Sequence, residues 1–197
     1  MQGSQFRSFQ EVGLGYTHNN AGSGGTWEVD PAHSSVEFSV KHMGIANVRG
    51  RFTDFQGTVD VGQDAWSAKA RGNIKVASID TGEAQRDTHL RSADFFDADA
   101  FPEITYESTK VEPLDENSSR VWGNLTMHGV TREVKLDLVL QGTDTDPWGN
   151  ERAGAEIQGF LNRKDFDMKF NQALGSGNLL VGDKVRIAIE VSGIRKK

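Results

Sequence analysis

Most of the chain alternates between apolar and polar residues. Val36, Phe38 and Val40, for example, are separated by single polar residues, and Val185, Ile187, Ile189 and Val191 repeat the pattern near the other end. A period of two indicates β-strands that bury one face and expose the other. The pattern predicts eight long strands, near residues 34–41, 51–61, 66–79, 103–111, 120–128, 131–142, 151–162 and 184–193.

Short segments with turn composition separate these strands. Residues 62–64, 115–118 and 144–150 are rich in Gly, Asn, Asp and Ser, and Gly129 stands between two strands with almost no linker. Such segments are typical of hairpins, and Gly129 predicts a sharp bend. Long strands joined by short turns predict an all-β fold, either an antiparallel up-and-down barrel or a sandwich.

One segment interrupts the strand pattern. Thr81 is a candidate N-cap, and the helix-forming residues after it predict a short helix over about residues 83–93. A loop with three phenylalanines follows at residues 94–102. Because aromatic side chains in a loop need an apolar environment, we expect them at the mouth of the barrel.

Small residues occupy the middle of two predicted inner faces. An eight-stranded barrel is either filled by its own side chains or holds one small ligand. The small residues favour an open centre, and larger apolar residues would form its wall. The pattern alone leaves a packed and a ligand-filled interior equally open. The small positions are Ala68, Ala70, Gly72, Ala153, Ala155 and Gly159, and the wall positions are Trp66, Ile74, Ile157 and Leu161.

Composition narrows the function classes. The net charge is −6 with dispersed basic residues, which argues against a nucleic-acid partner, and no apolar run predicts a membrane span. There are no cysteines, which excludes disulfides and thiolate chemistry. Residues 1–25 have the composition of a flexible tail without a secretory signal, so we expect a domain over 26–197 and a cytoplasmic protein. If a signal has been removed, the protein is periplasmic or extracellular.

Several motifs occur in an order that resembles the YceI-like family. They are WEVDPAHSSVEFSVKH at residues 27–42, SIDTG at 78–82, RDTHLRS at 86–92 leading into DFFD at 94–97, GNLTMHGVTR at 123–132 and NRKDF at 162–166. The resemblance implies a lipocalin-like, eight-stranded antiparallel barrel with a helix beside its mouth. It further implies a polyisoprenoid lipid in the lumen and a possible homodimer. Many members of the family are exported, and this chain departs from them in lacking a recognisable signal.

Given this resemblance, we expect the ligand to contact the inner faces of the strands, the helix and the Phe-rich loop. Arg86 or His89, and Arg163 from the other side, are candidates for a polar head group, although Arg86 with Asp87 is first of all a candidate structural pair. The expected ligand-binding residues are Phe38, Val40, His42, Phe55, Trp66, Ala70, Ile74, Arg86, His89, Leu90, Phe95, Phe96, Tyr106, Leu125, Ile157 and Arg163.

Candidate chemistry is sparse. His33, His42, His89 and His128 could act as bases or metal ligands, but their spacing does not match a zinc site. We therefore expect no catalytic residue, no metal and no cofactor other than a bound lipid. The favoured hypothesis is a lipid carrier or store in which residues 81–102 act as a lid. The alternatives are an enzyme using His42, His89 or His128 on an apolar substrate, and an interaction module with a fully packed lumen.

Overall fold

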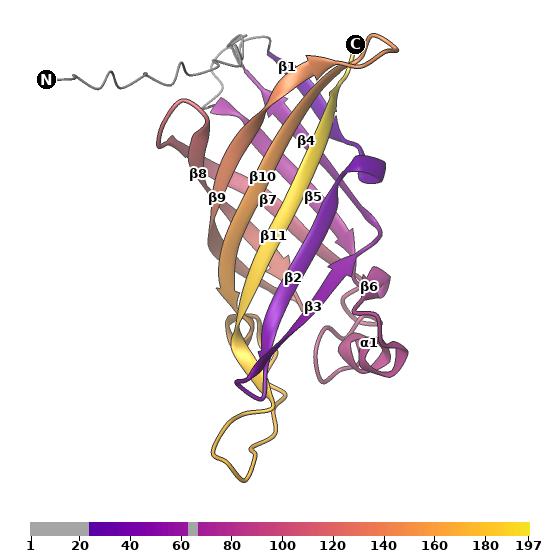
Figure 1. Cartoon of the computed structure of the whole chain (residues 1–197), viewed down its shortest axis with the longest axis vertical. Helices are drawn as coiled ribbons and strands as arrows, with labels where there is room; N and C mark the ends of the chain where they lie inside the picture. The colour runs from indigo at the N-terminus through magenta and orange to yellow at the C-terminus, as the bar shows by residue number, and fades with distance from the viewer. Residues whose placement is uncertain (1–23, 63–66) are drawn as a thin grey trace, which may run out of the picture.

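Antiparallel strands curl into a barrel in the computed structural model, which describes residues 24–62 and 67–197 (Figure 1). The strands are β1 (Gly25–Val29), β2 (Ser35–His42), β3 (Ala46–Phe52), β4 (Phe55–Val61), β5 (Lys69–Lys75), β6 (Ile79–Asp80), β7 (Glu103–Pro113), β8 (Ser118–Met127), β9 (Val130–Thr145), β10 (Glu151–Asn162) and β11 (Val181–Arg195). One α-helix, α1 (Ala84–Arg91), is present in this part of the chain.

The strands form a closed barrel with eight strand positions. β1 and β2 together occupy one position, because β11 pairs with both: Trp27 lies opposite Arg195, and Phe38 lies opposite Ile187. β3 and β4 together occupy the next position, because β3 pairs with β2 and β4 pairs with β1. The pairing of β1 with β11 closes the ring. The prediction of an eight-stranded antiparallel barrel is confirmed.

Three details of the strand prediction were wrong. The predicted strand 66–79 ends at Lys75 in β5, because Val76–Ser78 form a short 3-10 helix before β6. The segment 51–61 is not one strand, because the chain bends at Thr53 and Asp54 between β3 and β4. β1 was not predicted, because its five residues offer too short an alternating run to be recognised. Residues 63–66, which include part of one predicted turn, and most of the predicted tail lie outside the described residues.

The predicted helix exists but begins later than expected. Its N-cap is Glu83, whose carboxylate accepts hydrogen bonds from the backbone N–H groups of Gln85 and Arg86 at 3.0 and 2.6 Å. Thr81 is not the cap, because its hydroxyl donates to Asp87 and accepts from Arg86. These contacts fix the corner between β6 and α1 and anchor the helix below the barrel (Figure 1).

The bend at Gly129 is confirmed. His128 and Gly129 both have positive φ, 51° and 72°, so a two-residue turn joins β8 directly to β9. A Cβ at Gly129 would lie 2.5 Å from the Phe101 ring, which explains why glycine is required there.

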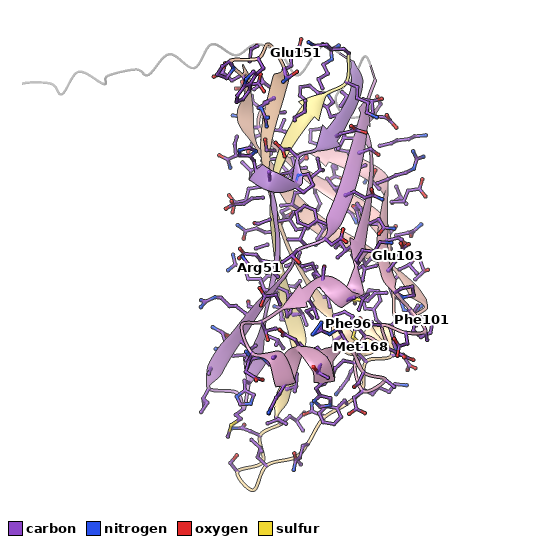
Figure 2. The ribbon with its side chains drawn as sticks, turned by 90° about the vertical axis from the view of Figure 1, so that its right-hand side faces the viewer. Arg51, Phe96, Phe101, Glu103, Glu151 and Met168 are labelled. Carbon is purple, nitrogen blue, oxygen red and sulfur yellow. The ribbon has the colours of Figure 1, made fainter. Side chains whose placement is uncertain are left out.

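The best-packed part of the molecule lies at the lower end of the barrel as drawn in Figure 1, around α1. Val76 and Phe166 are almost completely buried there. In Figure 2, Phe96 and Met168 lie together at this end, whereas Glu151 lies at the opposite end. None of the helices in the described ranges is long and apolar enough to cross a membrane.

Candidate ligand-binding site

The lumen contains a cavity of about 1970 Å³. Typical pockets for small ligands measure about 300–1,000 Å³, so this cavity can hold a larger molecule. The strands of the barrel contribute inward-facing apolar residues to the wall of this cavity, for example Val36 on β2, Leu138 on β9 and Ile189 on β11. The interior is therefore open rather than filled by the protein's own side chains.

Small residues keep the centre of the cavity open, as predicted. Ala68, Ala70, Gly72, Ala153 and Ala155 all line it. A Cβ added at Gly72 would meet only the Gln56 carbonyl oxygen, at 3.8 Å, so this position faces open space. Gly159 behaves differently, because the Leu136 side chain packs over it and a Cβ there would lie 2.5 Å from Leu136 Cδ2.

Most of the predicted ligand-binding residues lie on the cavity wall. Trp66 lies outside the described residues, while His42, Arg86 and His89 do not line the cavity. Contact with a ligand stays a prediction for the residues that do line it, which are Phe38, Val40, Phe55, Ala70, Ile74, Leu90, Phe95, Phe96, Tyr106, Leu125, Ile157 and Arg163.

The two predicted head-group residues of the helix point to local partners instead. Arg86 donates through Nε to Thr81 Oγ1 at 2.7 Å and through Nη2 to the Thr81 carbonyl at 2.9 Å. Asp87 also binds Thr81, so Arg86 and Asp87 act together on this residue, in keeping with a structural role.

His89 connects α1 to neighbouring protein segments at the lower end of the barrel. Its Nε2 lies 2.7 Å from Asp94 Oδ2, and its ring packs edge-on against Phe95 and Phe170, with centroids 5.1 and 4.9 Å apart. These contacts join α1 to the segment after β10. The histidine holds protein segments together and is turned away from the lumen.

Arg163 touches the cavity but has no donor to offer a ligand. A guanidinium has five N–H groups. Nε donates to the Gly182 carbonyl, Nη1 to those of Met168 and Phe170, and Nη2 to that of Val181 and to Asp183 Oδ1. Its side chain is only 5% exposed, and burial lowers the pKa of Arg163 against the opposing effect of Asp183. Its hydrogen bonds are structural, which contradicts the head-group prediction.

The cap (residues 81–102, comprising α1 and the Phe-rich loop) closes the apolar lower end of the cavity. Leu90, Phe95 and Phe96 from the cap line it together with Met168. Phe96 meets Phe52 of the barrel edge-on, with ring centroids 5.9 Å apart. The prediction that the Phe-rich loop reaches the barrel interior is confirmed for Phe95 and Phe96, whereas Phe101 packs on His128.

The upper end of the cavity is polar, which the sequence interpretation missed. We call Asn117, Ser119, Gln141 and Thr143, which all line this end, the polar collar. Ser119 is only 3% exposed and lines the cavity. The strand alternation could have revealed it, because Ser119 is two residues before the inward-facing Val121.

Tyr106 places a buried hydroxyl in the wall. Its ring covers Gly123, where a Cβ would lie 2.4 Å from Tyr106 Cζ, and its Oη has no partner within the described part of the chain. Burial raises the pKa of Tyr106 to about 12, so the phenol stays protonated and neutral at ordinary pH.

The three histidines proposed as bases lie away from the cavity wall. His128 binds the Phe166 carbonyl through Nδ1 at 3.1 Å, and neither it nor His42 or His89 lies on the cavity wall. Across residues 24–62 and 67–197, no group of three or more His, Cys, Asp or Glu residues could hold a metal ion.

Comparison with known proteins agrees with this geometry. A YceI-like domain profile matches residues 27–193. A UPF0312 protein of Pectobacterium atrosepticum is 40% identical over 166 residues, which are 84% of this chain and 83% of that protein. Burkholderia cenocepacia BcnA has the same fold, with a TM-score of 0.73, 24% identity, and coverage of 83% of this chain and 98% of that one.

A further structure with this fold is a polyisoprenoid-binding domain from Saccharophagus degradans. It has a TM-score of 0.67 and 14% identity, and covers 88% of this chain and 100% of that one. The profile match extends over most of the chain, and the sequence identity to the Pectobacterium protein is high across the barrel. The chain belongs to the YceI-like family.

Proposed function

We propose that this protein binds a long isoprenoid-type lipid in the lumen and carries or stores it. The observation that carries the proposal is the mainly apolar cavity of about 1970 Å³ in the lumen. An empty apolar space of this size forfeits packing contacts, and an apolar chain would supply them. Each buried methylene-sized group contributes about 0.8 kcal/mol before the cost of immobilising the ligand.

Two further observations support this proposal. The wall combines inward-facing aliphatic residues with the aromatic side chains of Phe38, Phe55 and Phe96, which suits a branched hydrocarbon. The Saccharophagus degradans structure with the same fold is described as a polyisoprenoid-binding domain. We propose that movement of the cap admits the lipid at the lower end.

The test is to extract the purified protein with organic solvent and to analyse the extract by mass spectrometry. We expect a polyprenyl lipid in a ratio of about one per chain, as one closed lumen implies. An extract without lipid, from a protein that also fails to take up an added polyprenol, would overturn the proposal.

A variant that fills the lumen gives an independent test. Ala70→Trp places a large ring in the cavity and should reduce lipid uptake to near background while leaving the barrel folded. Lys69→Trp is the matched control, because Lys69 is the exposed neighbour on the same strand. Equal uptake by the two variants would contradict the proposal that the lumen is the binding site.

We place the enzyme hypothesis second. His42, His89 and His128, its candidate bases, do not line the cavity. If the protein nevertheless transforms a lipid, His→Ala changes at these positions should abolish turnover while the lipid remains bound. Lipid recovered unchanged after incubation with the wild-type protein would argue for binding alone.

A further inference from the structure

We infer that the lower tip of the molecule is a docking surface for a bilayer that contains anionic lipids. The lower tip comprises residues 41–51, which form the turn between β2 and β3 with its flanking strands, and residues 168–182, which lead into β11. The loop before β11 reaches below α1 in Figure 1 and in Figure 2. This surface lies on the outside of the barrel, and the inference does not depend on a ligand in the lumen.

The two segments of the lower tip form one ordered unit. The N–H group of Met43 donates to the Leu180 carbonyl at 2.9 Å, which joins the β2–β3 turn to the longer segment. Within that segment, Ala173 and Leu179 form an isolated β-bridge, and the N–H group of Leu180 donates to the Gln172 carbonyl at 2.9 Å. Because these backbone groups pair with one another, the lower tip presents mainly its side chains to the surroundings.

The lower tip exposes large apolar side chains on both segments. Ile45 is 78% exposed and Leu179 is 42% exposed. Such side chains gain free energy when they leave water for the boundary between the head groups and acyl chains of a bilayer. A protein partner would need a complementary surface of about 800 Å² on each side, whereas a bilayer accepts a protruding turn without matching its shape. A small projecting tip therefore favours a bilayer.

The charges of the lower tip complement an anionic surface. Residues 41–51 and 168–182 contain no Asp or Glu, although the whole chain has a net charge of −6. Arg51 and Lys169 pair with carboxylates outside the tip. Lys41 and Arg49 are exposed and form no ion pair with the described residues. Unpaired cations around apolar side chains are suited to the negative surface potential of a membrane.

The upper end provides an internal comparison. Its two hairpin turns also expose apolar residues, since Leu114 is 49% and Trp148 is 78% exposed. Residues 112–117 and 143–151, however, contain six acidic residues and no Lys or Arg. Charges more than about 8 Å from a surface are largely screened at physiological salt, so the acidic upper end does not oppose docking of the lower tip. Docking therefore turns the cap toward the bilayer and the upper end away from it.

Sedimentation with vesicles tests the inference on the full-length protein. One kind of vesicle contains equal parts of phosphatidylcholine and phosphatidylglycerol, and the other contains phosphatidylcholine alone. We expect at least about tenfold stronger binding to the anionic vesicles. This advantage should disappear at about 1 M salt, where the screening length falls to about 3 Å. If the wild type binds neither kind of vesicle, the inference fails and the lower tip is better explained as a contact surface for a protein.

A variant of Ile45 tests the apolar contribution. Ile45→Asp should weaken binding to the anionic vesicles at least about tenfold, because it removes apolar contact and adds a negative charge. Trp148→Asp is the matched control, since Trp148 has the same exposed fraction at the opposite end. Far-UV circular dichroism should show that both variants are folded, because neither side chain is buried. Equal binding by the two variants would overturn the inference.

A double variant tests the contribution of charge. Lys41→Gln combined with Arg49→Gln should weaken binding to the anionic vesicles roughly tenfold. Lys69→Gln combined with Lys197→Gln removes the same net charge toward the upper end and should bind like the wild type. If both double variants lose affinity equally, the vesicles respond to net charge rather than to the lower tip, and the inference fails.

Discussion

The two ends of the barrel handle buried polar groups in opposite ways. At the lower end, Arg163 is buried deeply, yet each of its donors meets a protein acceptor. At the upper end, the side chains of Ser119, Gln141 and Thr143 line the cavity instead. The buried polar side chain at the lower end thus holds protein segments together, whereas the polar side chains at the upper end border the cavity.

The difference follows from what each end has to do. At the lower end, the residues after β10 must be held against the start of β11. Arg163 does this by donating hydrogen bonds to the carbonyl oxygens of Met168, Phe170, Val181 and Gly182. The upper end is built of simple hairpins, such as the turn in which Asp115 accepts from the N–H groups of Asn117 and Ser118. Such turns satisfy their own backbone and require nothing from the lumen.

The largest expected effect comes from removing the arginine of the lower end. Arg163→Met leaves four carbonyls and Asp183 without their buried donors, and we expect a loss of about 3–5 kcal/mol in the free energy of unfolding. Urea denaturation measures this loss. The control Lys164→Met removes only an exposed ion pair with Asp183 and should cost about 1 kcal/mol or less. Similar losses for both variants would contradict the structural role of Arg163.

A smaller effect is expected from weakening the cap. Phe96→Ala removes a partly buried ring from the contact with Phe52 and should cost about 2 kcal/mol, less than for a fully buried phenylalanine. Because the cap would then open more easily, bound polyprenol should exchange faster in a stopped-flow displacement assay. Phe160→Ala, on the exposed outer surface, is the control. An unchanged exchange rate in Phe96→Ala would argue that lipid enters elsewhere.

The smallest effect concerns acid stability near the upper end. Arg152 and then His33 hold the pKa of Asp30 down to about 2 from its ordinary 3.8, and Arg152 also binds Asp146. A lowered pKa in the folded state stabilises the protein above the ordinary value, and this stabilisation is lost as the pH falls from about 4 toward 2. Arg152→Gln should therefore flatten the decline in stability across this range.

The free energy of unfolding of wild type and Arg152→Gln should differ more at pH 6 than at pH 2, as measured by urea denaturation at each pH. A constant difference across the range would show that Arg152 acts through packing rather than through its carboxylate partners.

The sequence predicted the barrel well, because an alternating strand carries its own inward and outward assignment. Val36, Ala70, Leu138 and Ile189 all line the cavity as the period of two requires. It predicted the polar groups of the site poorly. Arg86, His89 and Arg163 are residue types that bind head groups, but other residues of the protein, which the fold brings next to them, are their hydrogen-bond partners.

The missed residues have the converse explanation. Ser119 is a small polar residue in a strand, and its place on the cavity wall depends on how that strand lies in the barrel. Gln141 is the residue skipped where the register of β9 on β10 shifts between Gly154 and Ala155, and Thr143 follows this irregularity, so simple alternation does not assign their faces. Side-chain chemistry alone therefore assigns ligand-binding roles to residues whose donors already bind other parts of the protein. It also overlooks small polar residues that line the cavity.

The ring closes where the earliest described strand meets the last one, Trp27 beside Arg195. Such a pairing joins segments separated by nearly the whole domain, so loop entropy delays its formation relative to the adjacent hairpins. During folding the sheet is therefore expected to remain open for a time, with its apolar inner face exposed. An apolar ligand present at that stage would be enclosed when β1 pairs with β11, and it would not have to enter through the mouth of the folded barrel.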